Sequence, residues 1–177
     1  MRPLPTNLLL NLCQSVLICA ICGLSGLACT TPRLGGDRPA MFEPVQMRIN
    51  PTFTRFRSFD ANQDPDGVEA DVELRDEFGD ATKGAGFVYF ELYDYVPEGA
   101  DVRGPQVGEA VRYDLSSVEA QRQHWQNVVR TYRFRLPWRE LDPQRRYVLS
   151  ATYLPGESSA GERLFDRLVI LPRRGEE

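Results

Sequence analysis

Residues 68–74 read VEADVEL, and in this stretch apolar and acidic residues alternate with a period of two. Successive side chains of an extended chain point to opposite faces, so such alternation is typical of a β-strand with one face in a hydrophobic core. The apolar face carries Val68, Ala70, Val72 and Leu74, and the acidic face carries Glu69, Asp71 and Glu73. The stretch therefore predicts a sheet that buries one side, and its neighbours should be runs of the same kind.

Further runs of this kind follow along the chain. Residues 86–96 (GFVYFELYDYV) are apolar or aromatic on both faces, which is typical of a central strand covered on both sides. Weaker or shorter strands are expected at 45–57 (interrupted at Pro51), 107–115, 128–136, 147–154 and 164–171. About seven short strands at regular intervals favour an all-β fold, an antiparallel β-sandwich.

A single helix is expected to interrupt the strands. Ser116 and Glu119 have the spacing of a capping box, and apolar residues recur after them at helical intervals. This pattern places Trp125 on the side of the helix that faces the body of the domain.

One short segment resembles a known family. Residues 141–147 (LDPQRRY) resemble the corner before strand F of fibronectin type III and immunoglobulin-like domains, where a tyrosine hydroxyl bonds back to the backbone of the turn. The resemblance implies an Ig/fibronectin III-like sandwich, in which the strands at 68–74 and 128–136 are neighbours. The acidic Glu69, Asp71 and Glu73 would then lie beside Arg133 and Arg135. Transthyretin-like and C2-like sandwiches are the alternatives.

The N-terminal stretch concerns location. Residues 8–29 (LLLNLCQSVLICAICGLSGLAC) are mostly apolar, follow Arg2 and end in small residues before Cys29, as an export signal does. Residues 24–29 (LSGLAC) resemble the lipobox of bacterial lipoproteins, which implies cleavage before Cys29 and lipid attachment to it. A simple signal peptide and an uncleaved anchor are the alternatives, because the stretch approaches the roughly 20 apolar residues that span a bilayer. All three place the rest of the chain outside the cytoplasm.

These features predict four parts of the chain. Residues 1–28 are expected to form the signal peptide helix, 29–41 a flexible tether rich in Pro and Gly, 42–172 the β-sandwich domain and 173–177 a charged tail.

Composition limits the chemistry of the domain. The four cysteines, Cys13, Cys19, Cys22 and Cys29, all precede residue 30, so the domain has no internal disulfide or thiolate nucleophile. The only histidine, His124, is expected on the helix surface and cannot build a His-based zinc site. The chain has no Gly-x-Ser-x-Gly elbow and no phosphate-binding Gly-rich loop. A net charge of −4 argues against nucleic acid as a partner.

Two candidate sites remain. The second face of the aromatic strand, with Tyr89, Tyr93 and Tyr95, is either covered by the helix that carries Trp125 or exposed as a platform for a protein or glycan. The loop DANQDPDG (60–67) offers Asp60, Asn62, Asp64 and Asp66 as oxygen ligands for Ca²⁺. The alternative for this loop is a polar turn that bonds its own backbone, with Gly67 at positive φ.

The sequence thus predicts a membrane-anchored lipoprotein of the bacterial cell envelope that acts as a non-catalytic structural or binding module. Its lipid anchor would bind a membrane, and calcium is the only cofactor that the sequence suggests. The alternative is an extracytoplasmic hydrolase acting on envelope or environmental polymers. Such an enzyme needs a cleft with two converging carboxylates, for which Glu91 and Asp94 together with a loop acid are candidates.

Overall fold

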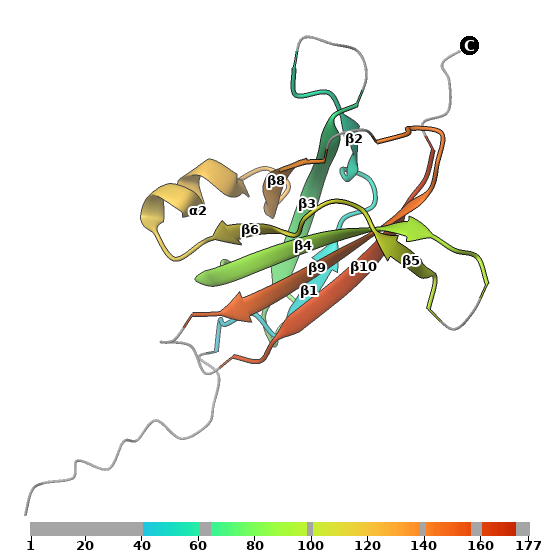
Figure 1. Cartoon of the computed structure of the whole chain (residues 1–177). Coiled ribbons are helices and arrows are strands. Elements are labelled where there is room, and N and C mark those ends of the chain that lie inside the picture. Colours follow the sequence, from blue (N-terminus) through green and yellow to red (C-terminus); the bar gives the residue numbers. More distant parts are fainter. Residues whose placement is uncertain (1–40, 61–64, 99–100, 139–140, 157–160, 173–177) are drawn as a thin grey trace, which may run out of the picture. The chain divides into compact units, whose positions relative to one another are not determined.

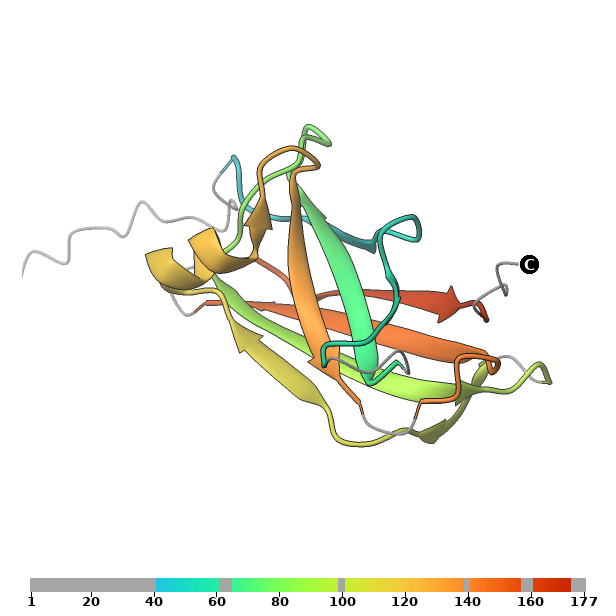
Figure 2. The same ribbon diagram turned by 90° about the horizontal axis from the view of Figure 1, so that it is seen from above.

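A computed structural model describes residues 41–60, 65–98, 101–138, 141–156 and 161–172. These residues form ten strands and one short helix, arranged as two antiparallel sheets that pack as a sandwich (Figures 1 and 2). The all-β sandwich expected from the alternating pattern is confirmed. The predicted signal peptide (1–28), most of the tether (29–40) and the tail (173–177) lie outside the described residues. In the described part of the chain, no helix is long and apolar enough to cross a membrane.

The first sheet is built around β3 (Gly67–Arg75), the strand predicted from VEADVEL. Its order is β1-β3-β8-β7, with β1 at Gln46–Ile49, β8 at Thr131–Pro137 and β7 at Trp125–Gln126. A further short strand, β2 (Arg55–Arg57), also pairs with β3. The irregular strand predicted at 45–57 is therefore two short strands, separated by the turn that contains Pro51.

The second sheet is built around β4 (Gly86–Tyr95). Its order is β10-β9-β4-β5, with β10 at Leu164–Ile170, β9 at Tyr147–Pro155 and β5 at Arg103–Gln106. The strand β6 (Val111–Asp114) pairs with the first half of β4, and β5 pairs with its last residues. The predicted strand at 107–115 is thus shorter than expected.

The core lies between the two sheets. It contains the inward residues of the four long strands, which include Val68, Ala70, Val72, Leu74, Val88, Phe90, Leu92, Tyr132, Phe134, Leu136, Leu149, Ala151 and Tyr153. Each set alternates along its strand with residues of the outer faces, as a period of two requires. The alternation in the sequence therefore identified the core face of β3 correctly.

The helix α2 (Val118–His124) begins one residue later than predicted. Its N-cap is Ser117, whose hydroxyl accepts a hydrogen bond from the Ala120 N–H at 3.1 Å. The N–H of Ser116 instead donates to the Asp114 carboxylate at 2.8 Å. The helix ends at His124, and Trp125 lies beyond it in β7. The predicted start of the next strand at Val128 is also wrong, because Val128 is in the turn between β7 and β8 and is 97% exposed.

His124 is buried, which corrects the expected surface position. Its ring stacks on Phe134 with centroids 5.0 Å apart and also contacts Tyr113. The helix places this ring at the side of the sandwich where β6 of the second sheet lies next to β8 of the first sheet. His124 thus acts as a packing residue that closes that side.

The predicted charge pairing of β3 with β8 is confirmed. Glu69 lies opposite Arg135 and Asp71 opposite Arg133 in the antiparallel register. The fully buried Asp71 carboxylate accepts hydrogen bonds from the Arg133 guanidinium at 2.8 and 3.0 Å. Glu69 forms its ion pairs with Arg55 and Arg57 of β2, at 3.8 and 3.6 Å. These pairs help to specify which strands are adjacent.

The turn at 141–147 contains the hydrogen bond that its resemblance predicts. The Asp142 N–H donates to the Tyr147 hydroxyl at 3.1 Å, while the Leu141 and Tyr147 side chains are buried in the core. This bond holds the turn in place at the start of β9.

Candidate binding surface on the second sheet

The strand β4 has one buried face and one open face. Val88, Phe90 and Leu92 are at most 1% exposed, whereas Phe87 and Tyr89 on the other face are half-buried. The expectation that both faces of this strand are covered is therefore wrong. A tyrosine is counted as apolar in a sequence pattern, but its hydroxyl and ring edge can remain in water.

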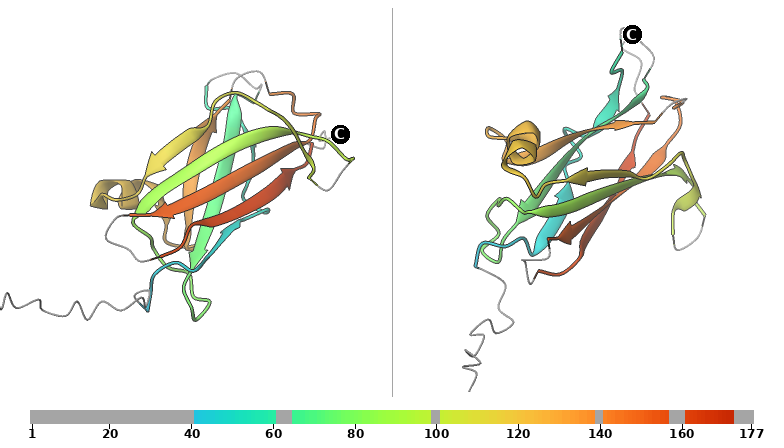
Figure 3. Two further views of the ribbon diagram at one scale, coloured as in Figure 1. Left: turned by 60° about the horizontal axis from the view of Figure 1, so that its bottom comes forward. Right: turned by 60° about the vertical axis from the view of Figure 1, so that its left-hand side comes forward.

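The helix does not cover this open face. It packs against β8 through His124, and Trp125 packs on Tyr132 with centroids 5.0 Å apart. No helix crosses β4, β9 and β10 where they lie side by side in the left view of Figure 3. Covering by the helix was the wrong alternative: the aromatic rings of this face are partly exposed, although Val148 and Ser150 of β9 on the same face are buried. We call this surface the outer face; it consists of Phe87, Tyr89, Glu91, Tyr93, Tyr95, Arg103, Arg112, Ser150, Thr152, Phe165 and Arg167.

The register of the sheet arranges the outer face in rows. Tyr89 lies opposite Thr152, which in turn lies opposite Phe165. Since neighbouring strands are about 4.8 Å apart, two strand spacings separate Tyr89 from Phe165 by about 10 Å. In the next row, Ser150 lies between Glu91 and Arg167. The face thus alternates aromatic rings with hydroxyl and charged groups.

Arginines lie over the rings of this face. Each guanidinium is within about 6 Å of a ring centroid, the range in which the ring quadrupole attracts a cation. Such pairs restrict the orientation of both groups before a ligand binds. The pairs are Arg103 over Tyr93 at 5.1 Å, Arg112 over Phe87 at 5.0 Å, Arg146 over Tyr95 at 5.7 Å and Arg167 over Phe165 at 5.9 Å.

Tyr93 also responds to its charged neighbours. Burial against the sheet raises the pKa of the Tyr93 phenol, and the adjacent Glu91 carboxylate raises this pKa further, while Arg103 opposes the change. The hydroxyl therefore stays protonated at neutral pH and can donate a hydrogen bond to a ligand.

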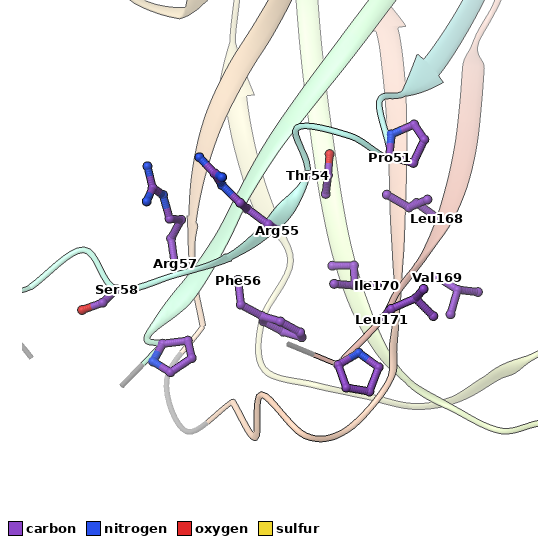
Figure 4. Close-up of a pocket in the computed structure, with 12 residues that line it drawn as sticks. Pro51, Thr54, Arg55, Phe56, Arg57, Ser58, Leu168, Val169, Ile170 and Leu171 are labelled. Atoms are coloured by element: carbon purple, nitrogen blue, oxygen red, sulfur yellow. The ribbon is translucent and has the colours of Figure 1, made fainter. Parts of the chain in front are cut away.

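Apart from the outer face, a hollow lies at the side of the sandwich where the two sheets separate (Figure 4). It has a volume of about 700 Å³ and lies between β2 and the end of β10, lined by residues that include Phe56, Leu168 and Ile170. Arg55 and Arg57 line it as well, and both pair with Glu69. Its described lining contains no carboxylate, imidazole or thiol.

The carboxylates proposed for a hydrolase do not converge. Glu91 and Asp94 are three residues apart on one strand, and an odd separation places their side chains on opposite faces. Glu91 belongs to the outer face, whereas Asp94 forms an ion pair with Arg145 at 3.2 Å. The prediction that these two could form a catalytic pair is wrong.

In the acidic loop, Asn62 and Asp64 lie outside the described residues. The Asp66 carboxylate accepts a hydrogen bond from the Phe59 N–H at 2.7 Å, and Asp60 accepts one from the Ser58 hydroxyl at 3.0 Å. Bonds of this kind are typical of a polar turn. Within the described ranges, no group of three or more His, Cys, Asp or Glu residues could hold a metal ion.

Gly67 is needed for a different reason than the turn alternative assumed. It is not among the glycines with positive φ, which are Gly79, Gly86 and Gly108. A Cβ at this position would come within 2.4 Å of both the Leu136 carbonyl oxygen and the Phe59 ring. Close packing at the start of β3 therefore requires glycine here.

Cys29, the predicted lipid attachment site, lies outside the described residues. The arginine partners of the β4 rings were not anticipated from the sequence, because β5 and β6 reach β4 only through the sheet register. Comparisons of the chain with protein-family models, with curated proteins and with solved structures find no match.

Proposed function

We propose that this protein is a membrane-anchored lipoprotein of the bacterial cell envelope whose sandwich is a non-catalytic binding module. The observation that carries this proposal is the outer face, where partly exposed aromatic rings are held by arginines and no helix of the described chain packs over the sheet. Tyrosine and arginine are enriched among the residues that contribute most to binding energy. The outer face is therefore the ligand-binding surface in this proposal.

Two observations support the lipid anchor and the type of sandwich in this proposal. The lipobox-like residues 24–29 support a lipid anchor at Cys29, which would hold the domain at the extracytoplasmic side of a membrane. The neighbouring positions of β1, β3 and β8, together with the bond from Asp142 to Tyr147, support a fibronectin III-like or immunoglobulin-like sandwich.

The non-catalytic role rests on the chemistry of the hollows. Two hollows bear on this role: the one between β2 and β10, and a smaller pocket on the outer face next to Glu91 and Arg167. Among the described residues, neither is lined by two carboxylates. Hydrolysis of a glycosidic bond usually needs such a pair.

The anchor is tested by fractionation. Wild-type protein should partition into membranes and detergent, whereas Cys29→Ser should accumulate as an unprocessed precursor. Equal processing and partitioning of the two proteins would contradict the lipid anchor.

The binding surface is tested with an aromatic double variant. The purified protein is immobilised in detergent, and envelope polymers released by sonication are passed over it. Tyr89→Ala/Tyr93→Ala should lose most of the binding, since it removes two rings of the outer face. Phe78→Ala is the matched control, because Phe78 is 63% exposed but lies in the turn after β3. If the double variant binds as well as the wild type, the outer face is not the binding surface.

A further inference from the structure

A pocket of about 370 Å³ opens on the outer face between β4, β9 and β10. Its lining contains hydroxyl groups from β9, an aromatic ring and several charged side chains. The lining residues are Glu91, Arg103, Ser150, Thr152, Arg163, Phe165 and Arg167. Three of the four charges in this lining are positive, in a chain whose net charge is −4. The pocket is therefore a local basic site on an acidic protein.

Asp101 shows what kind of group these arginines can hold. Its carboxylate lies 2.6 Å from the Arg103 guanidinium and 3.7 Å from that of Arg167. One carboxylate thus reaches two arginines that come from different strands. The hydrogen bond from Arg103 lowers the pKa of Asp101, so this carboxylate is charged at neutral pH.

The Asp101 carboxylate is also replaceable. Asp101 is exposed, and exposed ion pairs contribute little free energy. The third cation, Arg163, has no carboxylate within ion-pair distance among the residues that the structure describes. A ligand with its own anionic group could therefore displace Asp101 and gain a third guanidinium.

The groups around the arginines suit a sugar. Guanidinium groups bind carboxylates and phosphates through paired hydrogen bonds. Thr152, together with the largely buried Ser150, offers hydroxyls that can donate to or accept from sugar hydroxyls, and the Phe165 ring provides an apolar surface for the C–H face of a sugar ring. A small concave pocket with these groups fits a charged sugar unit.

We propose that this pocket binds an acidic saccharide, with the anionic group of one sugar held by Arg103, Arg163 and Arg167 in place of Asp101. This inference rests on the proposed function, because it assigns a ligand class to the same outer face. The anionic group is a carboxylate or a phosphate, which share the same recognition by guanidinium groups.

The test is calorimetric titration of the purified full-length protein in detergent. The probes are trigalacturonic acid, its neutral methyl ester and glucose 6-phosphate. We expect at least tenfold tighter binding of an anionic probe than of the ester, and affinity that falls as salt is added. The acid and the phosphate identify which anionic group the pocket prefers.

Variants locate the binding to the pocket. Arg167→Gln should weaken binding of the anionic probe about tenfold, which is the loss of one charge-assisted hydrogen bond. Asp101→Asn should strengthen binding about two- to fivefold, because it removes the internal competitor. Arg122→Gln is the matched control, since Arg122 is exposed on α2 and belongs neither to the outer face nor to the pocket lining; it should bind as the wild type does.

The failures of the two proposals are distinguishable. Equal binding of the acid and its ester overturns the anionic ligand but keeps the outer face as a binding surface. If none of the three probes binds while Tyr89→Ala/Tyr93→Ala still abolishes the capture of envelope polymers, the saccharide assignment is wrong and a protein ligand replaces it. If Asp101→Asn weakens the binding, Asp101 does not compete with the ligand and the proposed geometry is wrong.

Discussion

Two neighbouring residues of β4 should respond very differently to truncation. Phe90 has no exposed surface, and its ring lies 4.9 Å from that of Phe134 and 6.3 Å from that of Tyr113. Phe90→Ala leaves a cavity in this cluster, and such substitutions cost about 3 to 5 kcal/mol. Tyr89 is half-buried on the outer face, so Tyr89→Ala should cost about 1 kcal/mol or less, closer to the effect of a surface substitution.

Urea denaturation followed by tryptophan fluorescence measures both free energies of unfolding, since the chain has two tryptophans. The comparison is valid if the slope with urea is the same for both variants. Phe90→Leu serves as a control and should lose less than Phe90→Ala, because it fills part of the cavity. If Tyr89→Ala destabilises the protein as much as Phe90→Ala, the outer face is covered and our description of β4 is wrong.

Three further outcomes are expected. Arg133→Ala should lower the free energy of unfolding by about 2 to 4 kcal/mol in the same assay, because the buried Asp71 carboxylate loses its partner; a loss below 0.5 kcal/mol would contradict this. Burial raises the pKa of Tyr132 from 10.0 to about 12, so the folded state keeps this proton longer than the unfolded state. The contribution of Tyr132 to stability should therefore be constant below about pH 10 and be lost toward pH 12, so stability should fall less steeply over this range in Tyr132→Phe; an equal slope in both proteins would refute this role of Tyr132. The melting temperature should not change with a calcium chelator, because Asp60 and Asp66 already bond within their loop; a rise in millimolar calcium would instead establish the calcium site.

The parts of the fold that follow from local alternation were predicted correctly. Val68 and Val72 lie in the core because a period of two fixes the side of each residue once one face is buried. The pairing of β3 with β8 was implied by the fibronectin-like resemblance of residues 141–147, and the register places Asp71 opposite Arg133 as that order implied.

Errors arose where several local patterns were equally good or where packing overrides them. Ser116 and Ser117 both suit an N-cap, and only the bond from Ser116 to Asp114 decides between them. The helix could have continued through Trp125, but Trp125 instead pairs with Tyr132 in the first sheet. Tertiary pairing outweighs helix propensity here.

The candidate site was predictable only in part. Tyr89 and Tyr93 were identified because aromatic residues occupied both faces of one strand. The arginines were not, because Arg103 of β5 reaches Tyr93 of β4 through a register that the sequence alone does not determine. The pocket combines residues from four strands, β4, β5, β9 and β10, and from the segment just before β10.

The central claim is that the ligand binds the outer face of the second sheet. Photocrosslinking in living cells tests this most directly, with benzoylphenylalanine placed at Thr152 between Tyr89 and Phe165, and at Arg135 on the outward side of the first sheet as a control. We predict a covalent adduct of defined mass from position 152 and none from position 135. An adduct from position 135 alone, or the absence of an adduct at position 152, would contradict the claim.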